Sequence, residues 1–74
     1  MTKMEAYAYA SSHGSRFIAN VVLCHYSNPA KKLKGIARLL MSGKTVSLGA
    51  YSMDHLLIDG RSAEWSDLEK KGTR

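Results

Sequence analysis

The chain has 74 residues and a formal net charge of +5, from eleven Lys and Arg against six Asp and Glu. Its 45 % hydrophobic and 23 % charged residues, with one proline, are typical of a folded protein and exclude wholesale disorder. A domain this small buries only roughly 60 % of its unfolded surface, which argues against an enzyme with a deep, water-excluding pocket.

The first third of the chain is predicted to form two β-strands, over residues 4–12 and 16–27. Alanines and tyrosines alternate in the first segment, and a similar period of two runs through the second. Gly14 between them suits a two-residue hairpin turn. This register places the alanines on the core face, but a one-residue slip would exchange the faces, so the choice of buried face stays open. The opposite face then gathers three tyrosines, Tyr7, Tyr9 and Tyr26.

A helix is predicted over residues 29–42. The run Ser27-Asn28-Pro29 marks its start, because Asn is a favoured N-cap and Pro is favoured at the first helical position. Apolar side chains at helical spacing follow, and Gly43 is a favoured residue just after a helix. Three cations line the opposite face, together with Gly35, and these are Lys31, Lys34 and Arg38.

The rest of the chain is predicted to contain two strands and a second helix. Alternation over 44–51 indicates a strand. Between residues 52 and 60, a strand at 55–59 and a two-turn helix capped by Ser52 both fit, and the strand is favoured. A helix follows over 62–71, and 72–74 form a tail. We therefore expect one small two-layer α+β domain over 1–74, an antiparallel sheet in ββαββα order with the helices on one face.

The excess of positive charge lies in one short segment. Residues 31–44 contain five bases and no acid, for a net charge of +5, whereas residues 1–30, 45–60 and 61–74 carry +1, −2 and +1. Such a patch is typical either of a solvated helix face or of a surface that binds phosphates or an acidic protein. If the second alternative holds, the partner-binding residues are Lys31, Lys32, Lys34, Arg38 and Lys44.

No catalytic or metal-binding motif is found, so we expect no enzyme, no cofactor and no metal. Gly43-Lys44-Thr45 lacks the earlier glycine and the strand-before-helix context of a phosphate-binding loop. Cys24 and His25 are adjacent in a predicted strand and would point to opposite faces, which excludes a nucleophile–base pair. The histidines and the cysteine also lack the spacing of metal ligands.

The sequence carries no visible targeting signal. Its longest apolar run, Val21-Val22-Leu23-Cys24, is far shorter than the roughly 20 residues of a membrane span, and the first fifteen residues lack a signal-peptide pattern. A single cysteine cannot form an internal disulfide. We therefore expect a cytoplasmic protein with no membrane partner.

The tyrosine face has three interpretations. The face can be an outer covering of the sheet, a protein interface, or a platform on which nucleic-acid bases stack. Its residues are Tyr7, Tyr9 and Tyr26, with Arg16 nearby. A homodimer through this face is compatible with each of them.

The leading functional hypothesis is a small non-enzymatic basic protein that docks on an acidic protein or a nucleoprotein complex. Small basic domains of this kind include phage inhibitors of host nucleic-acid machinery, such as anti-CRISPR proteins, and that class is one expectation. The alternative is a domain that binds RNA or DNA directly, through the basic helix and the tyrosine-bearing sheet face.

Overall fold

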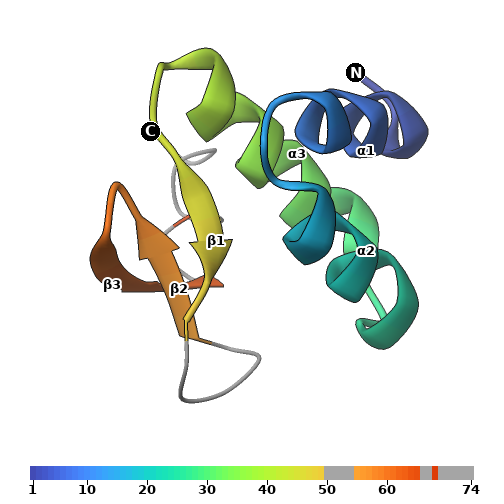
Figure 1. Ribbon diagram of the computed structural model, residues 1–74. Coiled ribbons are helices and arrows are strands. Elements are labelled where there is room, and N and C mark those ends of the chain that lie inside the picture. The colour runs from blue at the N-terminus through green and yellow to red at the C-terminus, as the bar shows by residue number, and fades with distance from the viewer. Residues whose placement is uncertain (50–54, 66–67, 69–74) are drawn as a thin grey trace.

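The computed structural model describes residues 1–49, 55–65 and 68. Three helices come first, and these are α1 (Lys3–Ser12), α2 (Arg16–His25) and α3 (Pro29–Met41). An antiparallel sheet follows, with β1 (Val46–Leu48), β2 (His55–Ile58) and β3 (Arg61–Glu64) in that spatial order. The helices form one side of the molecule and the sheet the other, and α3 contacts α1, α2 and β1 (Figure 1). The protein is a small α+β domain.

The two strands predicted over 4–12 and 16–27 are wrong, and the ββαββα order is wrong with them, because both segments are helices. Alanine is the strongest helix former and a poor strand former. The alternation that suggested a strand also places Ala6 and Ala10 one helical turn apart, and both are fully buried. A period of two among alanines therefore does not distinguish a strand from a helix.

The N-terminus of α1 carries a capping box. The Thr2 hydroxyl accepts a hydrogen bond from the Glu5 backbone N–H at 3.1 Å, and the Glu5 carboxylate accepts one from the Thr2 backbone N–H at 2.7 Å. This pattern, Thr followed three residues later by Glu, is a helix-start signal that was visible in the sequence. Two of the unsatisfied N–H groups at the helix start thereby gain partners.

Gly14 ends α1 rather than forming a hairpin turn. Its φ of +93° lies in the left-handed region, and the Ser15 N–H donates to the Ala10 carbonyl at 2.9 Å. This is the helix-ending geometry in which glycine is favoured just past the C-cap. The sharp turn sends the chain directly into α2.

Ser15, the first residue after this turn, links the helices to the sheet. Its side chain is buried, and its hydroxyl donates to the Val46 carbonyl of β1 at 2.7 Å. Val46 also lies at the end of the β1–β2 register, opposite Ile58. A buried hydroxyl is stable only when it is hydrogen-bonded, so this contact fixes where β1 lies against α2.

The helix predicted over 29–42 is confirmed, with bounds of 29–41. Gly43 has a φ of +89°, its N–H donates to Leu40, and the Lys44 N–H donates to the Leu39 carbonyl at 3.1 Å. These bonds satisfy the last carbonyls of the helix. Gly43-Lys44-Thr45 is thus a helix end followed by a strand.

Gly35 is buried, not exposed as predicted. A Cβ atom at this position would come within 3.2 Å of the Leu68 Cβ atom. Leu68 is itself buried, so the glycine allows it to approach the α3 backbone closely. The cost of a glycine inside a helix is therefore offset by packing within the same chain.

The C-terminal part confirms the strands and contradicts the start of the predicted second helix. The strand predicted over 44–51 is present as Val46–Leu48, and the strand predicted over 55–59 is present as His55–Ile58 in place of the alternative helix. Residues 62–64, predicted helical, belong to β3, whereas Trp65 and Leu68 are helical as predicted. The other parts of these predictions that fall on 50–54, 66–67 and 69–74, including the tail, lie outside the described residues.

The β2–β3 hairpin follows from Asp59-Gly60. Both residues have positive φ, 53° and 82°, which a type I′ turn requires, and Ile58 pairs directly with Arg61. Asp59 is held further by Thr45, whose backbone N–H donates to the Asp59 carboxylate at 2.9 Å. An Asp-Gly pair between apolar segments is a strong hairpin signal, and it accounts for β3 where a helix was predicted.

We expect Ser15→Ala to destabilise the fold by about 1–2 kcal/mol, because it leaves the Val46 carbonyl buried without its donor. Urea denaturation followed by circular dichroism measures this. Ser47→Ala, at an exposed position of the same strand, is the matched control and should change stability by less than about 0.5 kcal/mol. Equal effects of the two variants would contradict the assigned role of Ser15.

The capping box also predicts a pH dependence. The hydrogen bond from the Thr2 backbone N–H lowers the pKa of Glu5 below its ordinary value of 4.5. A carboxyl whose pKa is lowered by folding stabilises the fold above its unfolded pKa, and this contribution is lost as the pH falls through the folded pKa. Glu5→Gln keeps an acceptor without the charge. We therefore expect it to be less stable than the wild type at neutral pH and equally stable in strong acid, as measured by urea denaturation at both pH values.

Candidate functional site

The packing of α3 leaves only one face of this helix in contact with solvent. Its apolar side is fully buried, as Leu33, Ile36 and Ala37 show, because it contacts α1, α2 and β1. On the outer side Lys31 and Arg38 are exposed and Lys34 is half-buried between them. These three residues, at steps of three and four, are called the basic stripe below.

The basic stripe has no acidic neighbour along the helices. Glu5 is the only acid before residue 54, and its carboxylate is occupied by the capping box of α1. Residues 1–45 therefore carry seven bases and one acid, a net charge of +6, whereas residues 46–74 carry four bases and five acids, a net charge of −1. The segment with the three helices is strongly positive, whereas the described residues of the sheet segment, 46–49 and 55–65, hold one base and two acids for a net charge of −1.

Lys32 was predicted to bind a partner together with the stripe, but its side chain lies against two aromatic rings. The Lys32 ammonium nitrogen lies 5.1 Å from the centre of the Tyr26 ring and 5.6 Å from that of the Trp65 ring. The two rings meet edge to face at 5.6 Å, and the Trp65 indole N–H donates to the Tyr26 hydroxyl at 3.1 Å. Lys32 thus takes part in a cation–π cluster within the chain.

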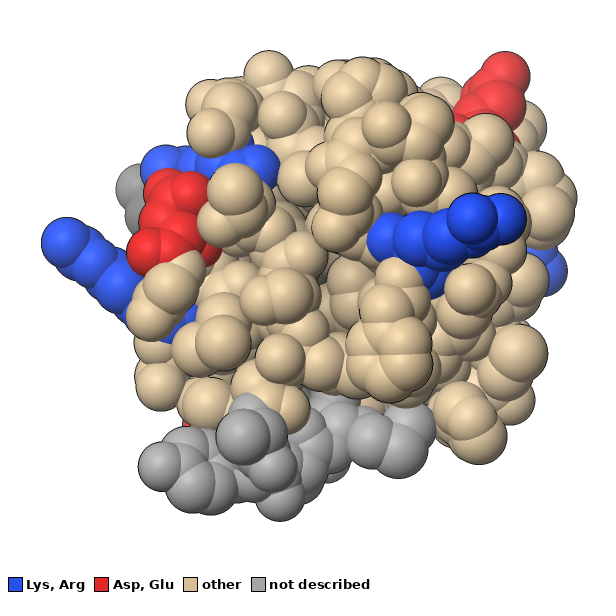
Figure 2. Space-filling model, viewed as in Figure 1, with Lys and Arg blue, Asp and Glu red and all other residues tan. Residues whose placement is uncertain are grey.

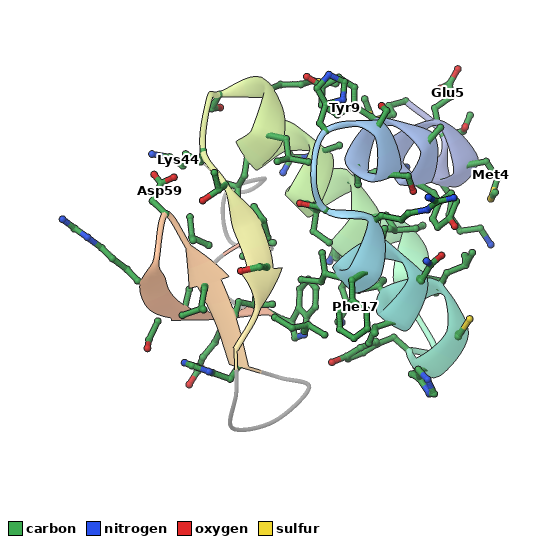
Figure 3. The ribbon with its side chains drawn as sticks, in the orientation of Figure 1. Met4, Glu5, Tyr9, Phe17, Lys44 and Asp59 are labelled. Carbon is green, nitrogen blue, oxygen red and sulfur yellow. The ribbon has the colours of Figure 1, made fainter. Side chains whose placement is uncertain are left out.

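Lys44 also lies apart from the stripe. It is exposed beyond the end of α3 and lines a hollow of about 560 Å³ together with Asp59 and Arg61. Figure 3 shows Lys44 and Asp59 at the same corner, and Figure 2 shows the acidic and basic side chains side by side there. The five predicted cations are therefore distributed over three places, and only three of the five share one surface.

A second, smaller hollow lies on the basic stripe itself. It has a volume of about 310 Å³ and is lined by Lys34, Arg38, Met1 and Met41. More than half of each methionine side chain is exposed, 55 % for Met1 and 52 % for Met41. The basic stripe therefore borders an apolar surface. Met41 follows Lys34 by seven residues, or two helical turns, and so lies on the same side of α3.

The predicted tyrosine face is wrong, because Tyr7 and Tyr9 lie on a helix and point to nearly opposite sides of it. The Tyr7 hydroxyl donates to the Asn20 side chain of α2. Tyr9 stacks on His13, with ring centres 3.8 Å apart, beside the turn that follows α1 (Figure 3). Tyr26 belongs to the cluster with Trp65, and β1, β2 and β3 contain no tyrosine. A stacking platform on the sheet is thus excluded for these three residues, while a homodimer stays a prediction.

The remaining chemical candidates do not assemble into a site. Cys24 and His25 lie at the end of α2, not in a strand, and both are exposed. Arg16 is exposed at the first residue of α2. Among the residues that the structure describes, no three His, Cys, Asp or Glu side chains are placed to share a metal ion. Within the same residues, no helix is both long enough and apolar enough to cross a membrane.

Comparisons of the chain with protein-family models, with curated proteins and with solved structures find no match.

The features that the sequence interpretation missed are the methionines beside the stripe and the partners of Lys32. The sequence alone does not show that a methionine is exposed. At helical spacing Met41 is grouped with the apolar residues that are expected to be buried. Trp65 is helical as predicted, but its contact with Tyr26, 39 residues away along the chain, has no signal in the sequence. Only tertiary structure brings such pairs together.

We expect different effects from removing neighbouring charges in the first turns of α3. Lys31→Met removes a cation that the helix dipole disfavours, and should stabilise the fold by about 0.3–1 kcal/mol. Lys32→Met removes the same dipole cost but also loses the contact with the two rings, so it should be less stable than Lys31→Met by about 0.5–1 kcal/mol. Urea denaturation measures both. Since Trp65 is the only tryptophan, its fluorescence should stay unchanged in the first variant and change in the second.

Proposed function

We propose that this protein is a non-enzymatic binding domain that docks on an acidic macromolecular partner through the basic stripe of α3. The observation that carries the proposal is the alignment of Lys31, Lys34 and Arg38 on the exposed face of α3, in a half of the molecule whose single acid is already occupied. The three helices hold no acid except this one, so within residues 1–45 the stripe cations are available to a partner of opposite charge.

The rigidity of α3 supports the same proposal. A docking surface binds most strongly when its residues are held in place before the partner arrives. Here the helix that carries the cations is also the helix with the most extensive buried face, and both of its ends are defined, by Pro29 at the start and Gly43 at the end. The cations therefore have fixed spacing along the helix axis, and docking does not require α3 to fold.

The positive field of residues 1–45 would act before contact. A net charge of +6 on the helical half attracts a negatively charged surface over a distance of roughly 8–10 Å at moderate salt. The same field orients the molecule, because the described residues of the sheet segment, 46–49 and 55–65, carry a net charge of −1. Association should therefore become slower as the salt concentration rises.

Direct binding of a nucleic acid is the second candidate, and one feature of the fold favours it. Helices α2 and α3 are joined by only three residues, Tyr26, Ser27 and Asn28, and the second helix is basic. Helix-turn-helix proteins use this element order to place their second helix in the major groove of DNA. The expectation of a phage inhibitor of host nucleic-acid machinery stays a prediction.

We expect the variant Lys31→Glu/Lys34→Glu/Arg38→Glu to lose macromolecular anion binding. The measurement is a fluorescence anisotropy titration of the full chain into a labelled Glu- and Asp-rich peptide, a DNA duplex and a single-stranded RNA, each at low salt. Wild type should bind the peptide, and the affinity should fall by at least tenfold in the variant because three contacts become repulsive.

The matched control reverses three exposed cations that lie outside the stripe, Arg16, Lys44 and Arg61, and so has the same net charge. It should bind nearly as tightly as the wild type. If the control loses as much affinity as the stripe variant, net charge and not the stripe determines binding. If wild type binds the duplex or the RNA but not the peptide, the second candidate replaces the first.

A further inference from the structure

The hollow beside the basic stripe combines apolar and cationic residues in one concave surface. It is lined by Met1 and Met41 and by the two stripe cations Lys34 and Arg38, and its volume is about 310 Å³. That volume is at the lower end of the range of roughly 300–1,000 Å³ that small-molecule pockets occupy. The hollow therefore suits a single side chain of a larger partner.

The exposure of the two methionines has no explanation in the packing of the chain itself. More than half of each side chain is in contact with solvent, although the fold buries most of its other large apolar residues on α3. Methionine side chains are flexible and polarisable, and surfaces that bind partners of varied shape use them for that reason. An apolar contact surrounded by charges is also the usual composition of a protein interface, with a hydrophobic centre and a polar rim.

Resting on the proposed function, we propose that this hollow recognises an acidic peptide segment that carries one large apolar side chain. The apolar side chain would lie between Met1 and Met41, and carboxylates on either side of it would pair with Lys34 and Arg38. Charge complementarity selects the occupant, because the helical half has a net charge of +6 and its one acid is occupied by a cap. The partner class is thus an acidic, amphipathic segment of another protein.

The lining of the hollow favours such a peptide over a nucleic acid. Phosphate backbones offer no apolar group to contact the methionine side chains, and interfaces with DNA are more polar than those with proteins. Single-stranded nucleic acids bind through bases that stack on aromatic rings. None of the described residues that line the hollow is aromatic, and Tyr9 is already stacked on His13 while Tyr26 meets Trp65 edge to face.

The experiment compares two synthetic peptides that differ in one residue. Both are short and rich in Glu and Asp, and the central residue is Leu in one and Ser in the other. The full chain is titrated into each labelled peptide and the anisotropy is recorded. We expect the Leu peptide to bind about tenfold more tightly, since burial of a leucine side chain favours binding and Ser offers no such gain.

Met41→Ser should remove this preference, so that the two peptides bind within about twofold of each other. Met4→Ser is the matched control, because Met4 is equally exposed at 53 %, lies on α1 and points away from the molecule (Figure 3). It should keep the tenfold preference. Lys34→Glu/Arg38→Glu should weaken binding of both peptides at least tenfold while leaving the circular dichroism spectrum unchanged.

The outcomes separate this inference from the proposed function. If the wild type binds both peptides equally and the stripe variant binds neither, the proposed apolar contact is wrong and the proposed function stays in place. A Leu preference that survives in Met41→Ser also overturns the proposed apolar contact, because the contact then lies elsewhere. Binding of a DNA duplex or an RNA in place of both peptides overturns it in favour of a nucleic acid. If no probe binds, both proposals fall.

Discussion

The burial of α3 on its inner side is the constraint on which the other features of this protein depend. Leu33, Ile36 and Ala37 have no solvent contact, because α1, α2 and β1 all pack on the same helix. Once that side is buried, the rotation of α3 about its axis is determined, since any other rotation would move apolar groups into water. The direction of Lys31, Lys34 and Arg38 is thus a consequence of the core and not of the charges themselves.

Contacts from the second half of the chain complete the surroundings of α3. Leu68 approaches the helix at Gly35, and Trp65 covers its first turns through Lys32 and Tyr26. Both contacts use residues that look unfavourable for a helix when considered alone, a glycine in its interior and a lysine near its positive end. The tertiary contacts offset these local costs. Lys31, which has the same dipole cost and no aromatic partner among the described rings, is the residue whose position is left without a structural explanation.

The sequence predicts α3 and the strands β1 and β2 correctly because their signals are local. Pro29 and Gly43 mark the ends of the helix, and the apolar spacing between them fits no strand. The prediction fails for α1 and α2 because a period of two was given more weight than alanine's helix propensity and the Thr2–Glu5 cap. It fails for β3 because Ser62 is a good helix cap in isolation, whereas the Asp59-Gly60 turn brings the next residues beside β2. A register between two strands is a tertiary property, and a single segment does not contain it.

The candidate site was predicted in part for the same reason. The alignment of Lys31, Lys34 and Arg38 depends only on helical spacing, so it follows from the sequence once the helix is known. The grouping of Lys32 and Lys44 with them assumed that neighbours in sequence share a surface. In the folded chain Lys32 lies against two rings, and Lys44 lines the larger hollow together with Asp59 and Arg61. The net charge of +5 in residues 31–44 therefore does not form a single surface patch of five cations. The stripe is smaller, and under the proposed function it would be more specific, because three cations at fixed spacing beside a hollow with apolar walls restrict a docking partner more than a diffuse excess of charge does.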